Sequence, residues 1–388
     1  MKTMKLIATM MTLSMLAAAF AGCLGGDDDD ETTTVKIGFL NPITGPLEPN
    51  APVFKWSADQ AIADLEEMYP DYNFELIEQD SGCDGAVAGP AAQTLVDSGV
   101  YAVVGAACSG ASMAANGVLS AAGIPMISYA STNPGLSDAS AYPMFYRNVP
   151  SDAIQGPAGA DMMTDAGVAD GALAVFGMTN DYGAGLADAV VDAWGSDKLC
   201  DVGRYDYAET DTDFSAIANQ MAADATCTAV YLSSYIADAA LIIEALNDAE
   251  WDGHIFGGDG PAGEGMYAEM EDDSLLNGMT VTQPRAGSSA GDFSARYDAN
   301  APSGGIKAYD LTTYDGVMMV GMAAVSNMDD ADASIMATGS GYAGSSGVIN
   351  FLDNGDIGGN GYDICSYDGV DQYTCSKYWT AEGGVATA

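Results

Sequence analysis

The sequence has few basic residues: 11 Lys and Arg stand against 55 Asp and Glu, and there is a single His. The formal net charge is −44 over 388 residues. This shortage excludes nucleic-acid binding through phosphate contacts, which needs clustered Lys and Arg. One His also excludes His-rich zinc sites and argues against Ser-His-Asp catalysis. With 48 % hydrophobic residues the chain can still build a core, so we expect a folded protein, and its length favours two lobes.

Long apolar runs are absent after the first 22 residues, so no later segment is expected to span a bilayer. The start itself predicts a secretory signal peptide over residues 1–22, with basic Lys2 and Lys5 before a mostly apolar stretch. It ends in Phe20-Ala21-Gly22-Cys23, which resembles the lipobox of bacterial lipoproteins and predicts lipidation of Cys23. The alternative is a cleaved signal with an incidental cysteine. The acidic residues 23–34 predict an extended tether.

The cysteine count is odd, but lipidation of Cys23 would leave six of the seven. In an exported chain an even number implies disulfides, although sequence alone allows fifteen connectivities. The order of the cysteines favours three local bridges; the alternative is buried free thiols. The favoured pairs are Cys83–Cys108, Cys200–Cys227 and Cys365–Cys375.

Short β-rich runs alternate with amphipathic stretches of helical length from Val35 onward. Expected strands are Val35–Leu40, Phe74–Glu78, Tyr101–Val104, Pro125–Tyr129, Ala172–Phe176, Ala229–Leu232, His254–Gly257 and Met279–Thr282. Expected helices are Val53–Met68, Ala88–Ser98, Ser109–Ala122, Ala153–Ala166, Gly183–Trp194, Phe214–Ala225, Ala237–Ala249 and Leu311–Asn327. This order predicts an α/β protein with parallel, doubly wound sheets. Four strands precede residues 142–150 and four follow, which indicates two similar lobes.

Three expected strand ends carry candidate ligand-binding residues, because ligands of such sheets bind beyond the carboxyl ends of the strands. Ser109 opens a helix, where its hydroxyl and free backbone N–H groups can hold a carboxylate. Thr132 follows the next strand among small hydroxyl residues, and Asp259 follows a glycine pair. Each also has a purely structural interpretation, as a helix cap or a turn residue.

At these residues the chain resembles the type I periplasmic binding proteins of branched-chain amino acid ABC transporters, the leucine/isoleucine/valine-binding family. The likeness runs over nearly the whole mature chain. It is carried by an ordered set of motifs: Lys36–Leu40, Thr44-Gly45-Pro46, Glu78–Cys83, Cys108-Ser109, Ala130–Pro134, Phe145–Asp152, Asp181-Tyr182-Gly183, Tyr309-Asp310, Tyr314-Asp315, Gly347–Phe351 and Asn354-Gly355-Asp356.

The resemblance implies two Rossmann-like doubly wound lobes joined by a three-segment hinge. Lobe 1 would comprise residues 35–151 and 282–338, and lobe 2 residues 152–281 and 339–388.

The ligand-binding residues that the resemblance implies are Ser109, Ala130, Ser131 and Thr132 from the first lobe, and Tyr182, Tyr235 and Asp259 from the second. Ser109, the Ala130 carbonyl and Thr132 would contact an α-carboxylate and ammonium, with Asp259 as counter-ion to the ammonium. The family commonly has a longer Glu at this last position. Residues 47–52 also depart from the family pattern where the side-chain pocket is shaped.

These expectations describe a solute-binding protein of an ABC importer, which takes up a small neutral, aliphatic amino acid and delivers it to a membrane permease. We expect no enzyme activity, cofactor or metal site, a monomer, and a lipid anchor at the outer face of the cell membrane. One alternative is a sensory module for amides, urea or other small polar solutes that feeds a receptor. Another is an exported hydrolase, for which His254 would be the base.

Overall fold

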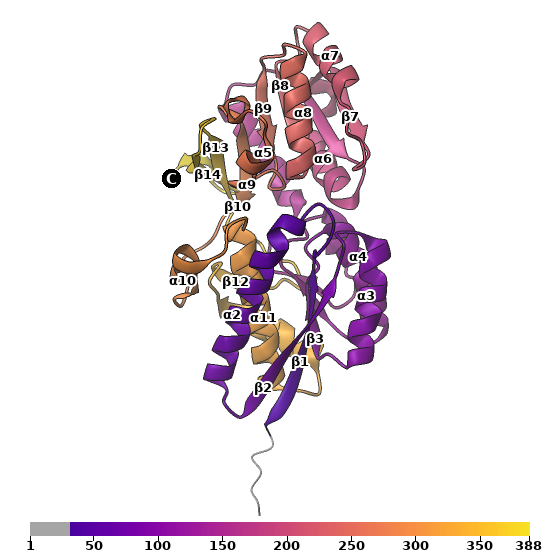
Figure 1. Ribbon diagram of the computed structural model, residues 1–388, viewed down its shortest axis with the longest axis vertical. Coiled ribbons are helices and arrows are strands. Elements are labelled where there is room, and N and C mark those ends of the chain that lie inside the picture. Colours follow the sequence, from indigo (N-terminus) through magenta and orange to yellow (C-terminus); the bar gives the residue numbers. More distant parts are fainter. Residues whose placement is uncertain (1–31) are drawn as a thin grey trace, which may run out of the picture.

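The computed structural model describes residues 32–388, which form two lobes, one above the other in Figure 1. The predicted signal peptide and the lipidated Cys23 lie outside the described residues. The first strand, β1 (Thr33–Asn41), begins inside the range predicted as tether. Within residues 32–388, no helix combines the length and the apolar character that a membrane crossing requires.

The first lobe is built on a five-stranded sheet in the order β2-β1-β3-β4-β5, and all its strands are parallel. The strands β1, β3 and β4 are largely buried, apolar runs, because helices cover both faces of the sheet. Figure 1 shows α3 and α4 on one side of the sheet and α2 and α11 on the other. Besides β1, the elements are β2 (Tyr72–Asp80), β3 (Ala102–Val104), β4 (Met126–Ser128), β5 (Phe145–Arg147), α2 (Ala51–Met68), α3 (Gly85–Ser98), α4 (Ser109–Ala121), α10 (Phe293–Asn300), α11 (Lys307–Ser326), α12 (Ala331–Thr338), and the short pair β11 (Ser340–Ala343) and β12 (Val348–Asn350).

The second lobe holds an eight-stranded sheet in the order β15-β14-β13-β10-β9-β8-β6-β7. The strands from β10 to β7 are parallel, and three C-terminal strands add an antiparallel edge. The elements are β6 (Leu173–Met178), β7 (Leu199–Tyr207), β8 (Ala229–Ser233), β9 (His254–Gly257), β10 (Thr280–Pro284), β13 (Tyr362–Tyr367), β14 (Tyr373–Thr380), β15 (Gly384–Thr387), α5 (Asp152–Asp165), α6 (Asp181–Trp194), α7 (Ser215–Ala223), α8 (Ile236–Asp248) and α9 (Gly265–Glu269). The predicted fold class, two doubly wound lobes, is confirmed.

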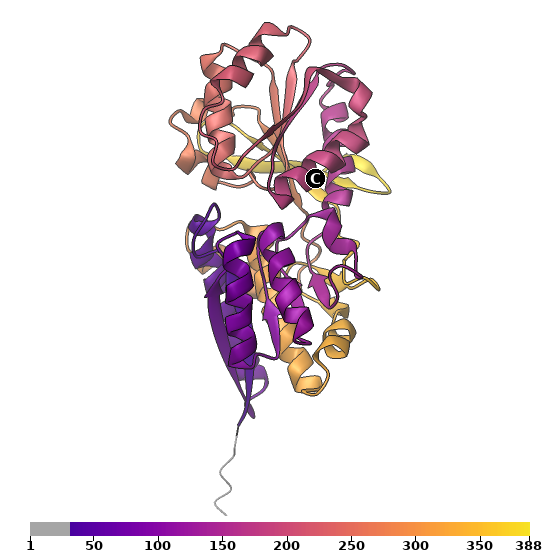
Figure 2. The ribbon, with the colours of Figure 1, turned by 90° about the vertical axis from the view of Figure 1, so that its right-hand side faces the viewer.

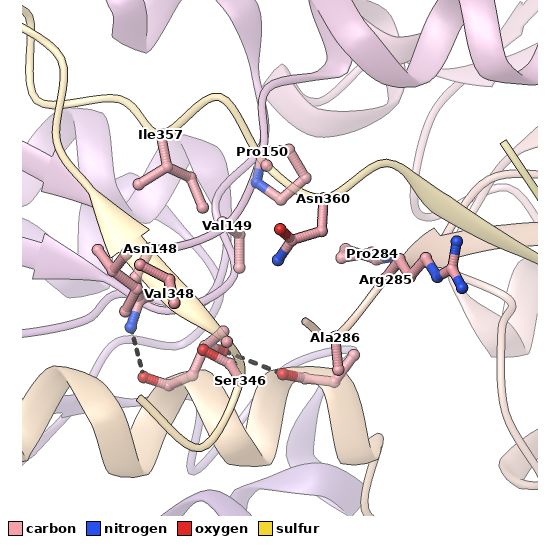
Figure 3. Close-up of a pocket in the computed structure, with 15 residues that line it drawn as sticks. Asn148, Val149, Pro150, Pro284, Arg285, Ala286, Ser346, Val348, Ile357 and Asn360 are labelled. Atoms are coloured by element: carbon pink, nitrogen blue, oxygen red, sulfur yellow. Dashed lines mark hydrogen bonds between the residues drawn. The ribbon is translucent and has the colours of Figure 1, made fainter. Parts of the chain in front are cut away.

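The chain passes between the lobes three times: after β5, after β10, and before β13. Figure 3 shows the three crossings side by side around a small cavity, with Asn148, Val149 and Pro150 from the first, Pro284 and Ala286 from the second, and Ile357 and Asn360 from the third. Arg285 points away from this cavity, and its guanidinium lies 3.6 Å from the centroid of the Tyr378 ring. The crossings form the three-segment hinge that the sequence predicts.

The lobe boundaries in the structure differ from those expected. Residues 339–357, expected in the second lobe, pack on the first: the Phe351 ring lies 5.0 Å from that of Tyr146, and Asp356 pairs with Arg147. The chain returns to the second lobe only at β13, as the yellow strands in Figure 2 show. The second crossing likewise follows Pro284, because β10 pairs within the second sheet. Apolar rings and a buried ion pair thus hold this segment on the first lobe.

The three disulfides join the cysteines in the predicted local order. Cys83–Cys108 ties the loop after β2 to the N-cap residue of α4. Cys200–Cys227 and Cys365–Cys375 both lie in the second lobe, the latter between β13 and β14. The prediction of three bridges is confirmed, and the first of them fixes the helix start that carries Ser109.

Candidate ligand-binding site

The order of strands in each sheet places the candidate residues at the same edge of the interlobe cleft. In the first sheet the order reverses between β1 and β3, and in the second between β6 and β8. Loops beyond the carboxyl ends of strands bind ligands at such reversal points. Ser109 follows β3, Ala130 follows β4, and Tyr182, Tyr235 and Asp259 follow β6, β8 and β9.

These residues line one pocket between the lobes, with an empty volume of about 400 Å³. Both lobes contribute to its wall, as the sequence predicts. The lining residues are Leu47, Phe54, Ala107, Ser109, Ala130, Tyr182, Tyr235, Asp259, Gly260, Ile306 and Tyr309. A pocket with apolar walls and a few converging polar groups is typical of small-molecule sites.

The first-lobe side of the pocket offers hydrogen-bond donors and one carbonyl. Ser109 begins α4, and its Oγ accepts a hydrogen bond from the Asn133 N–H at 3.2 Å, which leaves its own proton free to donate. The first N–H groups of an α-helix lack intrahelical partners, so a carboxylate fits there. Among the described residues, the Ala130 carbonyl accepts no hydrogen bond.

Ser131 and Thr132, also expected at the site, lie behind this surface and are not among the lining residues. The Ser131 Oγ lies 3.1 Å from the backbone carbonyl oxygens of both Ala106 and Ala107, and its one proton can be donated to either, so it stabilises the loop. The Thr132 Oγ1 is buried and has no partner within the described residues. A buried hydroxyl without a partner is costly, so Thr132 has an unused hydrogen bond to offer.

The second-lobe side consists of two stacked phenols and a carboxylate. The rings of Tyr182 and Tyr235 lie 5.1 Å apart at 16°. The Tyr182 hydroxyl donates to Asp259 Oδ1 at 3.0 Å and accepts the Gly260 N–H at 2.9 Å. A Cβ at Gly260 would meet the Ser234 carbonyl at 2.2 Å, so only glycine lets the chain present Asp259 here.

Tyr309 is a site residue that sequence reasoning missed. It lies in the first turn of α11, in the first lobe, and its hydroxyl donates across the cleft to Asp259 Oδ2. The sequence identified Tyr309-Asp310 as a family motif but gave it no role. An aromatic residue at a helix start is a weak signal, because only the closed arrangement of the lobes brings it to Asp259.

Asp259 and the neighbouring Asp152 are buried, and no cationic side chain is among the residues that line the pocket. Burial raises the pKa of Asp259, and burial followed by the charge of Asp259 raises the pKa of Asp152. Neither carboxylate oxygen of Asp152 has a hydrogen-bond partner within residues 32–388. Arg147 is fully buried, but its donors serve Asp356, the Ser137 hydroxyl and two loop carbonyls. None of the described residues that line the pocket is Lys, Arg or His, so Asp259 has no cationic partner in the pocket wall.

Asp310, next to Tyr309, couples the stability of the first lobe to pH. Burial raises its pKa to about 7, although the Tyr297 hydroxyl donates to Oδ2; Oδ1 has no partner in the described residues. The folded state thus holds this proton more tightly than the unfolded state does. Its contribution to the free energy of unfolding is complete below pH 4 and is lost as the pH rises through about 7.

We predict that Asp310→Asn flattens this pH dependence. Between pH 5 and pH 8, the wild type should lose about 3 kcal/mol of unfolding free energy relative to the variant. Denaturant titrations at both pH values measure the difference. Asp252→Asn, an exposed position, is the matched control for the loss of one acidic residue. Equal pH profiles for Asp310→Asn and wild type would contradict the prediction.

One cluster among the described residues has the spacing of metal ligands, formed by Cys200, Asp224 and Cys227. The two cysteines are bonded to each other, so their thiolates are not available to a metal. We therefore give this cluster no metal-binding role.

Comparisons with known proteins show which family the chain matches. The family described as "Receptor family ligand binding region" matches residues 55–369. The Leu/Ile/Val-binding protein homolog 3 of Brucella melitensis is 24 % identical over 344 residues, 86 % of this chain and 91 % of that protein. The leucine-, isoleucine-, valine-, threonine- and alanine-binding protein of Pseudomonas aeruginosa is 27 % identical over 277 residues, 71 % of this chain and 73 % of that protein.

Solved structures share the fold. The substrate-binding protein LivJ of Streptococcus pneumoniae, in complex with isoleucine, superposes with a TM-score of 0.77 at 22 % identity, over 92 % of this chain and 99 % of that one. The leucine-binding protein LivK of Thermotoga maritima superposes with a TM-score of 0.76 at 22 % identity, over 91 % and 99 %.

Proposed function

We propose that this chain, which belongs to the family described as "Receptor family ligand binding region", is a solute-binding protein of an ABC importer rather than an enzyme. Its ligand is a small neutral amino acid with an aliphatic, branched side chain. The ligand enters the cleft between the lobes, the hinge closes, and the closed form docks on a membrane permease.

This proposal rests on one observation: a single pocket offers a partner to both the carboxylate and the ammonium of an amino acid. Ser109 and the start of α4 offer donors to a carboxylate, and Asp259 offers a carboxylate to an ammonium. None of the lining residues is Lys, Arg or His, so a second acidic group on the ligand would find no counter-charge. Leu47, Phe54 and Ile306 supply apolar wall for the side chain. A zwitterion with an aliphatic side chain complements all three features.

The proposal also includes the cellular location of the protein. Three disulfides favour an oxidising, extracytoplasmic location. We propose that the mature chain is held at the outer face of the membrane by lipid on Cys23, through the acidic segment that follows it.

A thermal-shift series tests the proposed ligand. In a buffer of high ionic strength, leucine, isoleucine and valine should each raise the melting temperature, by about 5 °C at a thousand times their Kd, and the rise should continue with the logarithm of the concentration. Glutamate and lysine should not, because their extra charge would be buried without a partner.

The same series includes urea, short amides and polyols as the competing ligand class. Stabilisation by one of these, with no response to any amino acid, would contradict the proposal. The des-amino analogue 4-methylpentanoate should bind more weakly than leucine, because it leaves Asp259 without a cation.

A further inference from the structure

Asp259 is held from both lobes at once. Tyr182, from α6 of its own lobe, donates to Oδ1, and Tyr309, from α11 of the other lobe, donates to Oδ2. All three side chains are at most 5 % exposed. The Asp259 carboxylate therefore connects the two lobes through its two hydrogen bonds.

We propose that the Tyr309 hydroxyl and the Asp259 carboxylate form a closure latch, a hydrogen bond that exists only when the lobes are closed and that shifts the hinge toward the closed form. Tyr309 acts as a positioning residue: it orients the carboxylate of Asp259 and slows opening of the cleft.

The latch must break on opening because each partner is fixed in its own lobe. Tyr309 is anchored by the backbone of α11, whose Thr312 hydroxyl donates to the Tyr129 carbonyl at 2.7 Å inside the first lobe. Asp259 is anchored by Tyr182 and by the strand that precedes it. Neither side chain can follow the other when the lobes separate.

The environment makes this bond stronger than an exposed polar contact across the cleft. Burial raises the pKa of Tyr309 well above 10, so its hydroxyl keeps its proton and donates. Hydrogen bonds to a charged acceptor in a buried site are about twice as strong as neutral ones. By contrast, the Asn133 side chain donates to the Asp181 carbonyl at an exposed position. Water replaces that contact at little cost.

The latch also links closure to the ligand. An ammonium beside Asp259 would favour the ionised form of the carboxyl group that accepts from Tyr309, so ligand binding and lobe closure stabilise each other. This effect on the ligand rests on the proposed function, whereas the effect on the ligand-free hinge does not.

Tyr309→Phe keeps the ring and removes the latch. Small-angle X-ray scattering of the ligand-free protein should show a shift to a larger radius of gyration than in wild type. Stopped-flow measurements with leucine should show a dissociation rate about 10-fold higher, with the association rate unchanged. The matched control is Tyr314→Phe, on the same helix, whose hydroxyl donates to Asp64 within the first lobe. It should leave both measurements unchanged.

Identical scattering for wild type, Tyr309→Phe and Tyr314→Phe would overturn the latch, whatever the ligand. If no amino acid binds, the proposed function fails, and the scattering experiment still decides on the latch. Near-ultraviolet circular dichroism checks that Tyr309→Phe is folded. Should it not fold, Asp259→Ala, which removes the acceptor, must give the same shift in scattering; the absence of a shift there would also overturn the proposal.

Discussion

Replacing Asp259 by Asn is expected to weaken binding of leucine at least about 30-fold, the largest loss we predict at the site. The variant removes the one acidic group of the pocket wall, and truncating one partner of a buried charge pair costs about 2–5 kcal/mol. Asn also offers a single oxygen, so the hydroxyls of Tyr182 and Tyr309 can no longer both donate to separate carboxylate oxygens. Calorimetric titration of both proteins with leucine measures the loss.

The des-amino analogue separates the two effects of this substitution. With 4-methylpentanoate, only the hydrogen bonds of Tyr182 and Tyr309 are disturbed, so the loss should be about 10-fold or less. Repeating the pair of titrations in the Tyr309→Phe background removes the latch from the comparison. Asp252→Asn, exposed in the same lobe, controls for the change in net charge. Equal losses for leucine and its analogue would show that Asp259 does not bind the ammonium.

The central strands of both sheets were predictable from the sequence because buried parallel strands consist of continuous runs of apolar residues. The expected strand Val35–Leu40 lies inside β1, and Ala229–Leu232 lies inside β8. The edge strand β7 was missed, because its sequence Leu-Cys-Asp-Val-Gly-Arg-Tyr-Asp-Tyr mixes polar and apolar residues as half-exposed strands do. The three-residue strand β5 was too short to give a pattern.

The lobe boundary at residue 338 was not predictable for a different reason. Residues 339–357 are rich in Gly and Ser and carry no apolar periodicity. Tertiary contacts hold these residues on the first lobe. The backbone N–H groups of Ser345 and Ser346 and the Ser346 hydroxyl donate to the carboxylate of Asp315, inside α11. Such a pairing of distant residues leaves no local signal.

The candidate site was predictable to the extent that strand ends locate it. Ser109, Ala130, Tyr182, Tyr235 and Asp259 do converge on one pocket. Their contacts with a ligand stay predictions. Tyr309 was missed because its role depends on the distance between two lobes. The sequence shows a carboxylate shorter than the family's Glu at position 259, but not the phenol that reaches it from the opposite side.

Arg147 provides the largest expected effect on stability. Its side chain is fully buried, and its Nε lies 2.6 Å from Asp356 Oδ1. The guanidinium also donates to the carbonyls of Ser131 and Asn133, at 3.3 and 3.0 Å. It therefore joins the loop that carries Thr132 to the segment that leads into the third crossing. Without Arg147, Asp356 Oδ1 and the buried Ser131 carbonyl would lose this hydrogen-bond donor.

We predict that Arg147→Met lowers the free energy of unfolding by about 3–5 kcal/mol, because it leaves the Asp356 carboxylate buried without its cation. Adding Asp356→Asn should recover part of the loss, since the unpaired charge is then removed. Urea denaturation of the two single variants and the double variant measures the coupling.

Arg204→Met is the matched control, because Arg204 pairs with Asp188 and Asp206 at a partly exposed site. Its loss should cost less than about 1 kcal/mol and should vanish in concentrated salt, which screens exposed charges. The loss from Arg147→Met should persist in the same salt, because water and ions do not reach a buried pair. Equal and salt-sensitive losses for the two variants would contradict a structural role for the buried pair. In the acidic surroundings of this chain, the buried Arg147 is then a structural cation, and the ammonium of the proposed ligand remains the predicted cation at Asp259.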